Sequence, residues 1–266
     1  MKLAFSTIGC PDWSLDEIVT VAKDLNYDGI EIRGVGRELY APDIKQLTTD
    51  SEKFLARLDR VKLKISCLTS GATLAAFDTI EKSVSEAKAY IDLANRLRVP
   101  FVRVMSTDKP YYDGGDIDLC EKKFKEIVRY AEGSGVTPLM ETNGLFVDTM
   151  LLKSFLSATG GGALWDIHHP YRFGGESVDK TYDNLKEFVK YVHVKDSVVK
   201  NGTTAYKITG YGDVPIAEAV KLLSDGGYDG YLSMEWVKRW NKDLEEPGVV
   251  FAHYPFFMKR ILAEAH

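Results

Sequence analysis

The sequence predicts a single-domain (β/α)₈ barrel covering residues 1–266, and three observations support this. Short apolar runs alternate with amphipathic stretches, the alternation repeats eight times, and the chain length suits one such barrel. Strands separated by helices pair in parallel through right-handed crossovers. The main alternative, a doubly wound open sheet, usually needs fewer strands and often has a glycine-rich phosphate loop after its first strand. The stretch STIGCPDW (6–13) is not such a loop.

The expected strands are short runs rich in apolar and β-branched residues, bounded by polar or glycine-containing segments. They cover residues 2–7, 29–34, 63–68, 101–106, 137–142, 163–168, 191–196 and 231–236.

The expected helices show apolar residues at helical spacing. In the first of them, Ile18, Val21 and Leu25 recur with this period, and Ser14 followed by Glu17 is a capping-box start. Further amphipathic stretches cover residues 81–99, 120–136 and 216–230, and the tail 238–266 is expected to contain the last helix. Aromatic residues in this tail are also compatible with a subunit contact, which leaves a homo-oligomer open.

Composition limits the classes of partner. Lysine and arginine total 34 against 39 aspartate and glutamate, a net charge of −5 without a basic stripe, which argues against nucleic acid. No apolar run approaches membrane-spanning length, and no leader-like apolar region follows the N-terminus. Three cysteines lack CxxC spacing, so reduced thiols in a cytoplasmic protein are expected. We therefore expect a small-molecule substrate, with neither nucleic acid nor membrane as a partner.

Four consecutive expected strands end with an inward-facing polar residue. Barrel strands alternate between the helix layer and the interior, and this parity turns Glu141, Asp166, His193 and Glu235 inward at the C-terminal rim. Burying an unpaired carboxylate costs several kcal/mol, and crowded carboxylates repel one another. A divalent cation removes both penalties. The sequence therefore predicts one divalent metal ion. Mn²⁺, Co²⁺, Mg²⁺ and Zn²⁺ all suit these ligands, and the residues do not choose among them.

Each of these residues taken alone also has a structural explanation. Glu141 or Glu235 can pair with a neighbouring arginine or lysine, Asp166 can cap a turn, and His193 can be a satisfied core histidine. Their coincidence on adjacent strands at matching depth favours the metal site.

Six segments of the chain match a known family: 9–34, ETNG (141–144), WDIHHP (165–170), HVKD (193–196), GYGDVP (210–215) and GYDGYLSMEW (227–236). Through them the chain resembles the xylose isomerase-like TIM barrel superfamily, in its sugar phosphate isomerase/epimerase branch. The resemblance implies that Glu141 and Glu235 are the catalytic acid/base pair as well as metal ligands, and that Asp166 and His193 chiefly position the metal.

The function implied is a metal-dependent isomerase or epimerase of a small sugar, keto-sugar or sugar phosphate. A proton would be removed and returned through an enediolate. The alternative is a dehydratase of the inosose or dehydroshikimate type. An endonuclease IV-like nuclease is less favoured because it needs a histidine-rich site and the chain has five histidines. A non-catalytic sugar-binding barrel is disfavoured by the complete ligand set.

Further residues are expected near the site. His169 matches a substrate-binding histidine of several relatives, with a surface-loop histidine as the alternative. Lys195 can hold a substrate oxygen or pair with Asp196 or another acid. Arg103 is a candidate substrate-binding residue too. For Arg103, together with Glu31 and Arg33, a buried ion-pair network is favoured over substrate contact.

The connection at residues 197–215 is long and glycine-bearing, which is typical of loops that serve an active site. The amides at Gly210 and Gly212 are a weak candidate for binding an oxyanion, and an ordinary solvent turn is equally plausible.

Overall fold

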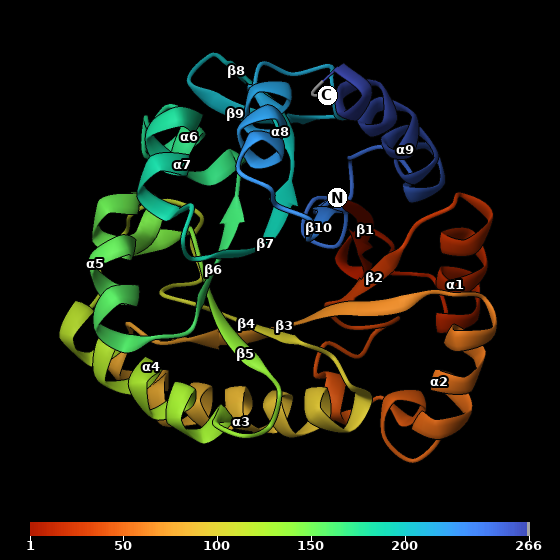
Figure 1. The fold of residues 1–266 in the computed structure, drawn as a ribbon, viewed down its shortest axis with the longest axis horizontal. Helices are drawn as coiled ribbons and strands as arrows, with labels where there is room; N and C mark the ends of the chain where they lie inside the picture. The colour runs from red at the N-terminus through yellow and green to blue at the C-terminus, as the bar shows by residue number, and fades with distance from the viewer. Residues whose placement is uncertain (265–266) are drawn as a thin grey trace.

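The computed structural model describes residues 1–264, which form a closed barrel of eight parallel strands surrounded by helices (Figure 1). The strand order around the barrel is β1-β10-β7-β6-β5-β4-β3-β2, and the pairing of β1 with β10 closes it. The predicted barrel is confirmed and the open sheet is excluded. The strands are β1 Lys2–Ser6, β2 Gly29–Ile32, β3 Lys64–Thr73, β4 Phe101–Met105, β5 Thr137–Glu141, β6 Gly162–Asp166, β7 Val189–Val194 and β10 Tyr231–Met234.

The helices form an outer ring and cover the strands from outside (Figure 1). The predicted capping box is present at the start of the first helix, where the Ser14 side chain accepts from the Glu17 amide. The helices are α1 Leu15–Asp24, α2 Ser51–Arg60, α3 Ile80–Leu97, α4 Ile117–Ala131, α5 Thr149–Thr159, α6 His168–Phe173, α7 Val178–Leu185, α8 Ile216–Asp225 and α9 Pro247–Glu264, with 3-10 turns at Thr7–Gly9, Ala41–Asp43, Lys45–Leu47, Phe77–Thr79 and Gly144–Val147.

The core has two layers, as the alternation of strand residues requires. The larger layer lies between strands and helices and contains fully buried side chains such as Trp165. A smaller apolar cluster contains Leu139, Leu164 and Tyr191, each two residues before a predicted metal ligand on its strand. This cluster therefore fills the barrel interior beneath the polar rim. The cluster forms an apolar layer beneath the site.

The connection after β7 folds into an antiparallel hairpin, β8 Asp196–Lys200 and β9 Thr203–Lys207. Asp196 ties this hairpin to the segment that follows it. Its Oδ2 accepts the backbone N–H groups of Gly210 at 2.8 Å and Gly212 at 2.9 Å. The weak prediction of an oxyanion site at these glycines is therefore wrong, because the protein's own carboxylate occupies both amides. Gly212 is needed because a Cβ there would collide with Asp196.

Replacing Asp196 with alanine is expected to destabilise the fold by about 2 to 4 kcal/mol, because buried backbone donors lose their acceptor. Besides the two glycine amides, Ser197 and Val214 donate to Oδ1 at 2.9 and 3.3 Å. Urea unfolding measures the loss, and limited proteolysis should cut the hairpin segment faster. Asp225→Ala is the matched control, since Asp225 is exposed and, within the described residues 1–264, pairs only with Lys221. Equal stability of the two variants would contradict this role.

Two other sequence-based expectations concern cysteines and membranes. Cys10, Cys67 and Cys120 are buried free thiols, as expected for reduced cysteines. Within residues 1–264, no helix is both long enough and apolar enough to cross a bilayer.

Candidate active site

The structure brings the four predicted ligands together at the C-terminal ends of the strands. Glu141 ends β5, Asp166 ends β6, His193 lies in β7 and Glu235 directly follows β10. Each offers one ligand atom, and these atoms all lie within 4.8 Å of one another. From Nδ1 of His193 the distances to the carboxylate oxygens of Glu235, Asp166 and Glu141 are 3.5, 3.8 and 3.9 Å.

The histidine is held so that one ring nitrogen faces the three carboxylates. Its Nε2 lies 3.0 Å from Oε2 of Glu31, and the same oxygen accepts from the Ser233 hydroxyl at 2.7 Å. A carboxylate behind a ligating histidine is a common orienting partner in metal sites. Glu31 was expected to belong to a buried ion-pair network, and this orienting role was not predicted.

Nδ1 of His193 is fully buried and has no hydrogen-bond partner within the described chain. A buried nitrogen of this kind costs free energy unless a ligand satisfies it. Donors bonded at about 2.1 Å to one ion lie about 3.0 to 4.2 Å apart, which is close to the observed separations. The residues therefore fit a divalent cation.

Burial and charge push the pKa values of the site in different directions. Burial opposes charge on His193, but the carboxylates of Glu31 and Glu235 outweigh it and raise its pKa well above the ordinary value. Burial raises the pKa of Glu141, and the Arg103 charge only partly offsets this. For Glu235 burial is outweighed by Lys195 and then His193, which lower its pKa to about 2. The two glutamates are therefore unequal: Glu235 is held ionised and Glu141 is the easier to protonate.

Lys195 is part of the site. Its Nζ lies 2.6 Å from Oδ2 of Asp166, 2.5 Å from Oε2 of Glu235 and 3.0 Å from Nε2 of His169. It therefore pairs with two acids of the cluster and not with Asp196. The two oxygens of Glu235 face different groups, because Oε1 is the one directed at His193.

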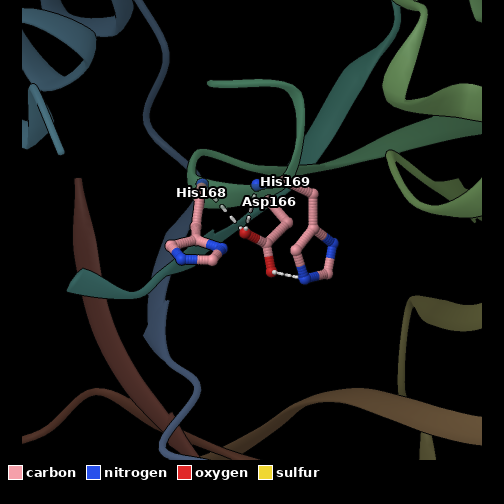
Figure 2. A group of neighbouring side chains, drawn as sticks. All are labelled: Asp166, His168 and His169. Carbon is pink, nitrogen blue, oxygen red and sulfur yellow. Dashed lines mark hydrogen bonds and ion pairs between the residues drawn. The ribbon is translucent and has the colours of Figure 1, made fainter. Parts of the chain in front are cut away.

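His169 is buried, with 5% of its surface exposed, so the surface-loop alternative is wrong. Helix α6 begins directly after β6 and brings the ring back over the site, where its two nitrogens lie 3.5 Å from oxygens of Glu141 and Asp166. Figure 2 shows His168 and His169 on either side of Asp166, whose Oδ1 accepts both of their backbone N–H groups. Burial lowers the pKa of His169 to about 4, so its ring is neutral at pH 7.

His168 was missed by the sequence analysis, which placed it at the end of the expected strand 163–168, whereas it is the first residue of α6. It is fully buried, and its Nε2 lies 2.9 Å from the hydroxyl of Ser197 in β8. Asp166, His168 and His169 form a second group that could hold an ion (Figure 2). It shares Asp166 with the first group and contains one carboxylate instead of three, so the first group is the stronger cation site.

The expected buried ion-pair network is present only in part. Nε of Arg103 lies 3.1 Å from Oε2 of Glu141, and its Nη1 donates to the carbonyl of Ser70 at 2.9 Å. Glu31 pairs with His193. The prediction does not hold for Arg33, which has no carboxylate oxygen within 4.0 Å among residues 1–264.

A cavity of about 590 Å³ opens above the cluster. This volume lies within the range of about 300 to 1,000 Å³ typical of small-molecule sites. Tyr206, from hairpin strand β9, lines it and was also missed, because the hairpin's return over the barrel mouth has no local sequence signal. The charged and ionisable side chains in its wall include Arg33, Arg103, Glu141, His169, Lys195 and Glu235.

The fold and this strand-end cluster define a barrel of the type expected from the sequence, and comparison with known proteins agrees. The chain belongs to the xylose isomerase-like TIM barrel family, whose sequence model matches residues 19–251.

Among curated proteins, the chain is 23% identical over 252 residues to fructoselysine 3-epimerase of Shigella flexneri, covering 89% of this chain and 90% of that one. Solved structures with the same fold include the probable 3-DHS dehydratase AsbF of Bacillus anthracis, at 18% identity and a TM-score of 0.78, covering 97% of this chain and 99% of that one. The IOLI protein, solved with a bound zinc atom, also has a TM-score of 0.78 at 16% identity, and the match covers 100% of this chain and 99% of that one.

Proposed function

We propose that this protein is a metal-dependent isomerase or epimerase of a small sugar, keto-sugar or sugar phosphate. The observation that supports it most is the convergence of three buried carboxylates on Nδ1 of His193, which has no hydrogen-bond partner among residues 1–264. Two of these carboxylates, Glu141 and Glu235, line a cavity of about 590 Å³. The similarity to fructoselysine 3-epimerase supports the reaction class.

Glu141, Asp166, His193 and Glu235 would hold the ion. Mn²⁺ is the preferred ion, and Co²⁺, Mg²⁺ and Zn²⁺ suit the same donors. When bound, such an ion supplies a Lewis acid that polarises the substrate carbonyl and makes the adjacent C–H more acidic.

Glu141 and Glu235 are proposed to move the proton. Glu141 ends β5 and Glu235 directly follows β10, and β6 and β7 separate these two strands in the barrel order, so the two glutamates can reach a substrate from two directions. The ionised Glu235 suits removal of the proton next to the carbonyl, which leaves an enediolate, and the more easily protonated Glu141 suits its return. The same pair can work in the reverse direction.

Lys195, His169 and Arg103 are proposed to bind and orient the substrate. All three line the cavity beside the carboxylates. Lys195 also keeps Glu235 ionised through their 2.5 Å contact. The neutral ring of His169 can exchange hydrogen bonds with a sugar hydroxyl.

The second candidate is a dehydratase, favoured by the position of Lys195. Its ammonium lies 3.0 Å from His169, so this pair can donate a proton to a departing β-hydroxyl after Glu235 has taken the carbon-bound proton. The hydroxyl would then leave the β-carbon as water, at the step in which an isomerase would return the proton to carbon.

Deuterium uptake from heavy water tests the proposal. With added Mn²⁺, the protein is expected to exchange one carbon-bound hydrogen of its substrate when ketoses, ketose phosphates, hydroxypyruvate and inososes are screened by NMR. Loss of water to give an unsaturated product would instead identify the dehydratase. The absence of exchange and of product with every compound, in protein shown to contain the ion, would contradict the proposal.

A further inference from the structure

Arg33 is a basic residue in the cavity wall that forms no ion pair with an acidic side chain of residues 1–264. It directly follows β2, its backbone N–H donates to the Thr7 hydroxyl at 2.8 Å, and its Nη1 donates to the carbonyl of Leu39 at 3.4 Å. These bonds fix the backbone of Arg33 and one edge of its guanidinium group. Among residues 1–264, no carboxylate oxygen lies within 4.0 Å of its guanidinium.

The acids nearest to this part of the wall are engaged elsewhere. The charges of Glu86 and Glu235 act on Arg33, but from beyond 4.0 Å. Oε1 of Glu86 accepts the backbone N–H of Gly71 at 2.5 Å, and Oε2 of Glu235 lies 2.5 Å from Nζ of Lys195. Asp108 also lines the cavity, but its side chain is 75% exposed and lies 3.6 Å from Lys109. None of these three acids forms an ion pair with Arg33.

A second guanidinium on the same side of the cavity raises the free-energy cost of leaving Arg33 without an acidic partner. Arg103, from β4, also lines the cavity, and its charge is committed to Glu141. Burial lowers the pKa of Arg33, and the like charge of Arg103 lowers it further. A partly buried cation without a partner is unfavourable, so an anionic ligand would stabilise this wall.

Between the two arginines the wall is formed by the backbone of β3 at Gly71. A Cβ at this position would lie 3.2 Å from Oε1 of Glu86 and 3.3 Å from Nη2 of Arg33. The absence of a side chain therefore leaves the guanidinium edge accessible from the cavity.

We propose that Arg33 is an anion-binding residue for the substrate, and that the substrate is an acidic ketose whose carboxylate or phosphate lies at the end remote from the reacting carbonyl. This inference rests on the proposed function. The strands that carry the arginines, β2 and β4, lie on the side of the barrel away from β6 and β7. The planar guanidinium matches a carboxylate or a phosphate through two parallel N–H bonds.

The test uses three ketoses that share one carbon skeleton. D-fructuronate has a carboxylate at C6, D-fructose 6-phosphate a phosphate, and D-fructose a neutral hydroxyl. Deuterium exchange by the Mn²⁺-loaded protein is expected to show kcat/KM roughly 30-fold higher for one acidic ketose than for D-fructose, mainly through KM. The better of the two acids identifies the anion. Arg33→Gln should abolish this preference, and Arg33→Lys should retain part of it.

A binding measurement makes the result independent of turnover. Malonate and inorganic phosphate are titrated calorimetrically into metal-free protein, which avoids their chelation of the ion. The wild type and Arg96→Gln, an exposed arginine on α3, should bind one of them equally. Arg33→Gln should bind it at least roughly 10-fold more weakly. Near-UV circular dichroism checks that each variant is folded. If Arg33→Gln is not folded, Arg33→Lys decides the matter: a partial loss of the preference for the acidic ketose would support the anion site, and the full wild-type preference would count against it.

The outcomes separate the two proposals. Exchange with D-fructose and no preference for either acid, or equal anion binding by the wild type and Arg33→Gln, would overturn the anion site and leave the isomerase standing. Anion binding that depends on Arg33, without exchange on any ketose of the wider screen, would support the anion site and overturn the isomerase.

Discussion

Replacing Glu235 with glutamine is expected to lower turnover by roughly 10³-fold or more while the barrel stays folded. Glutamine cannot accept the proton, and it removes one of the three negative charges at the ligand cluster. Lys195 keeps a partner in the variant because its Nζ also lies 2.6 Å from Asp166. Glu141→Gln is expected to have an effect of the same size, since Glu141 would return the proton. Steady-state kinetics and thermal unfolding are measured on both variants.

Glu121→Gln is the matched control for both substitutions. Glu121 lies on α4 and pairs with Lys125 on the surface, so its loss is expected to change neither rate nor stability appreciably. If either site variant retained more than about a tenth of wild-type turnover, the residue would not be an essential acid or base.

Removing the metal with a strong chelator is expected to abolish turnover, and added Mn²⁺ should restore it. The ion should also raise the thermal midpoint, because binding to the folded state alone at 100 times its dissociation constant adds about 2.7 kcal/mol. Without it, Nδ1 of His193 stays buried and unsatisfied. Elemental analysis is expected to find about one ion per chain.

His193→Ala should lose the bound ion and the thermal shift together. His253→Gln is the matched control, because His253 lies on α9 and contacts the carbonyl of Thr209 at 2.8 Å, outside the ligand cluster. Full turnover by a metal-free protein would refute the metal-dependent mechanism.

The sequence by itself determined the barrel and the polar composition of its rim. Residue alternation along a strand has a period of two, so the inward direction of Glu141, Asp166, His193 and Glu235 follows from where the apolar residues of each strand lie. The capping box at Ser14 is equally local. These features depend on residues a few positions apart, and their geometry is set by the backbone alone.

The tertiary structure alone decided how the charged residues pair. Glu31 and His193 are 162 positions apart, yet they share a hydrogen bond that orients the metal ligand. No local pattern predicts the pairing of Lys195 with Asp166 and Glu235 either. The same holds for the absence of an acidic partner for Arg33 in the part of the chain that the structure describes. These contacts depend on the stagger of neighbouring strands and the path of each connecting loop. The sequence offers each charged residue several chemically equivalent partners. Which of them it pairs with depends on how close their side chains lie in the folded protein.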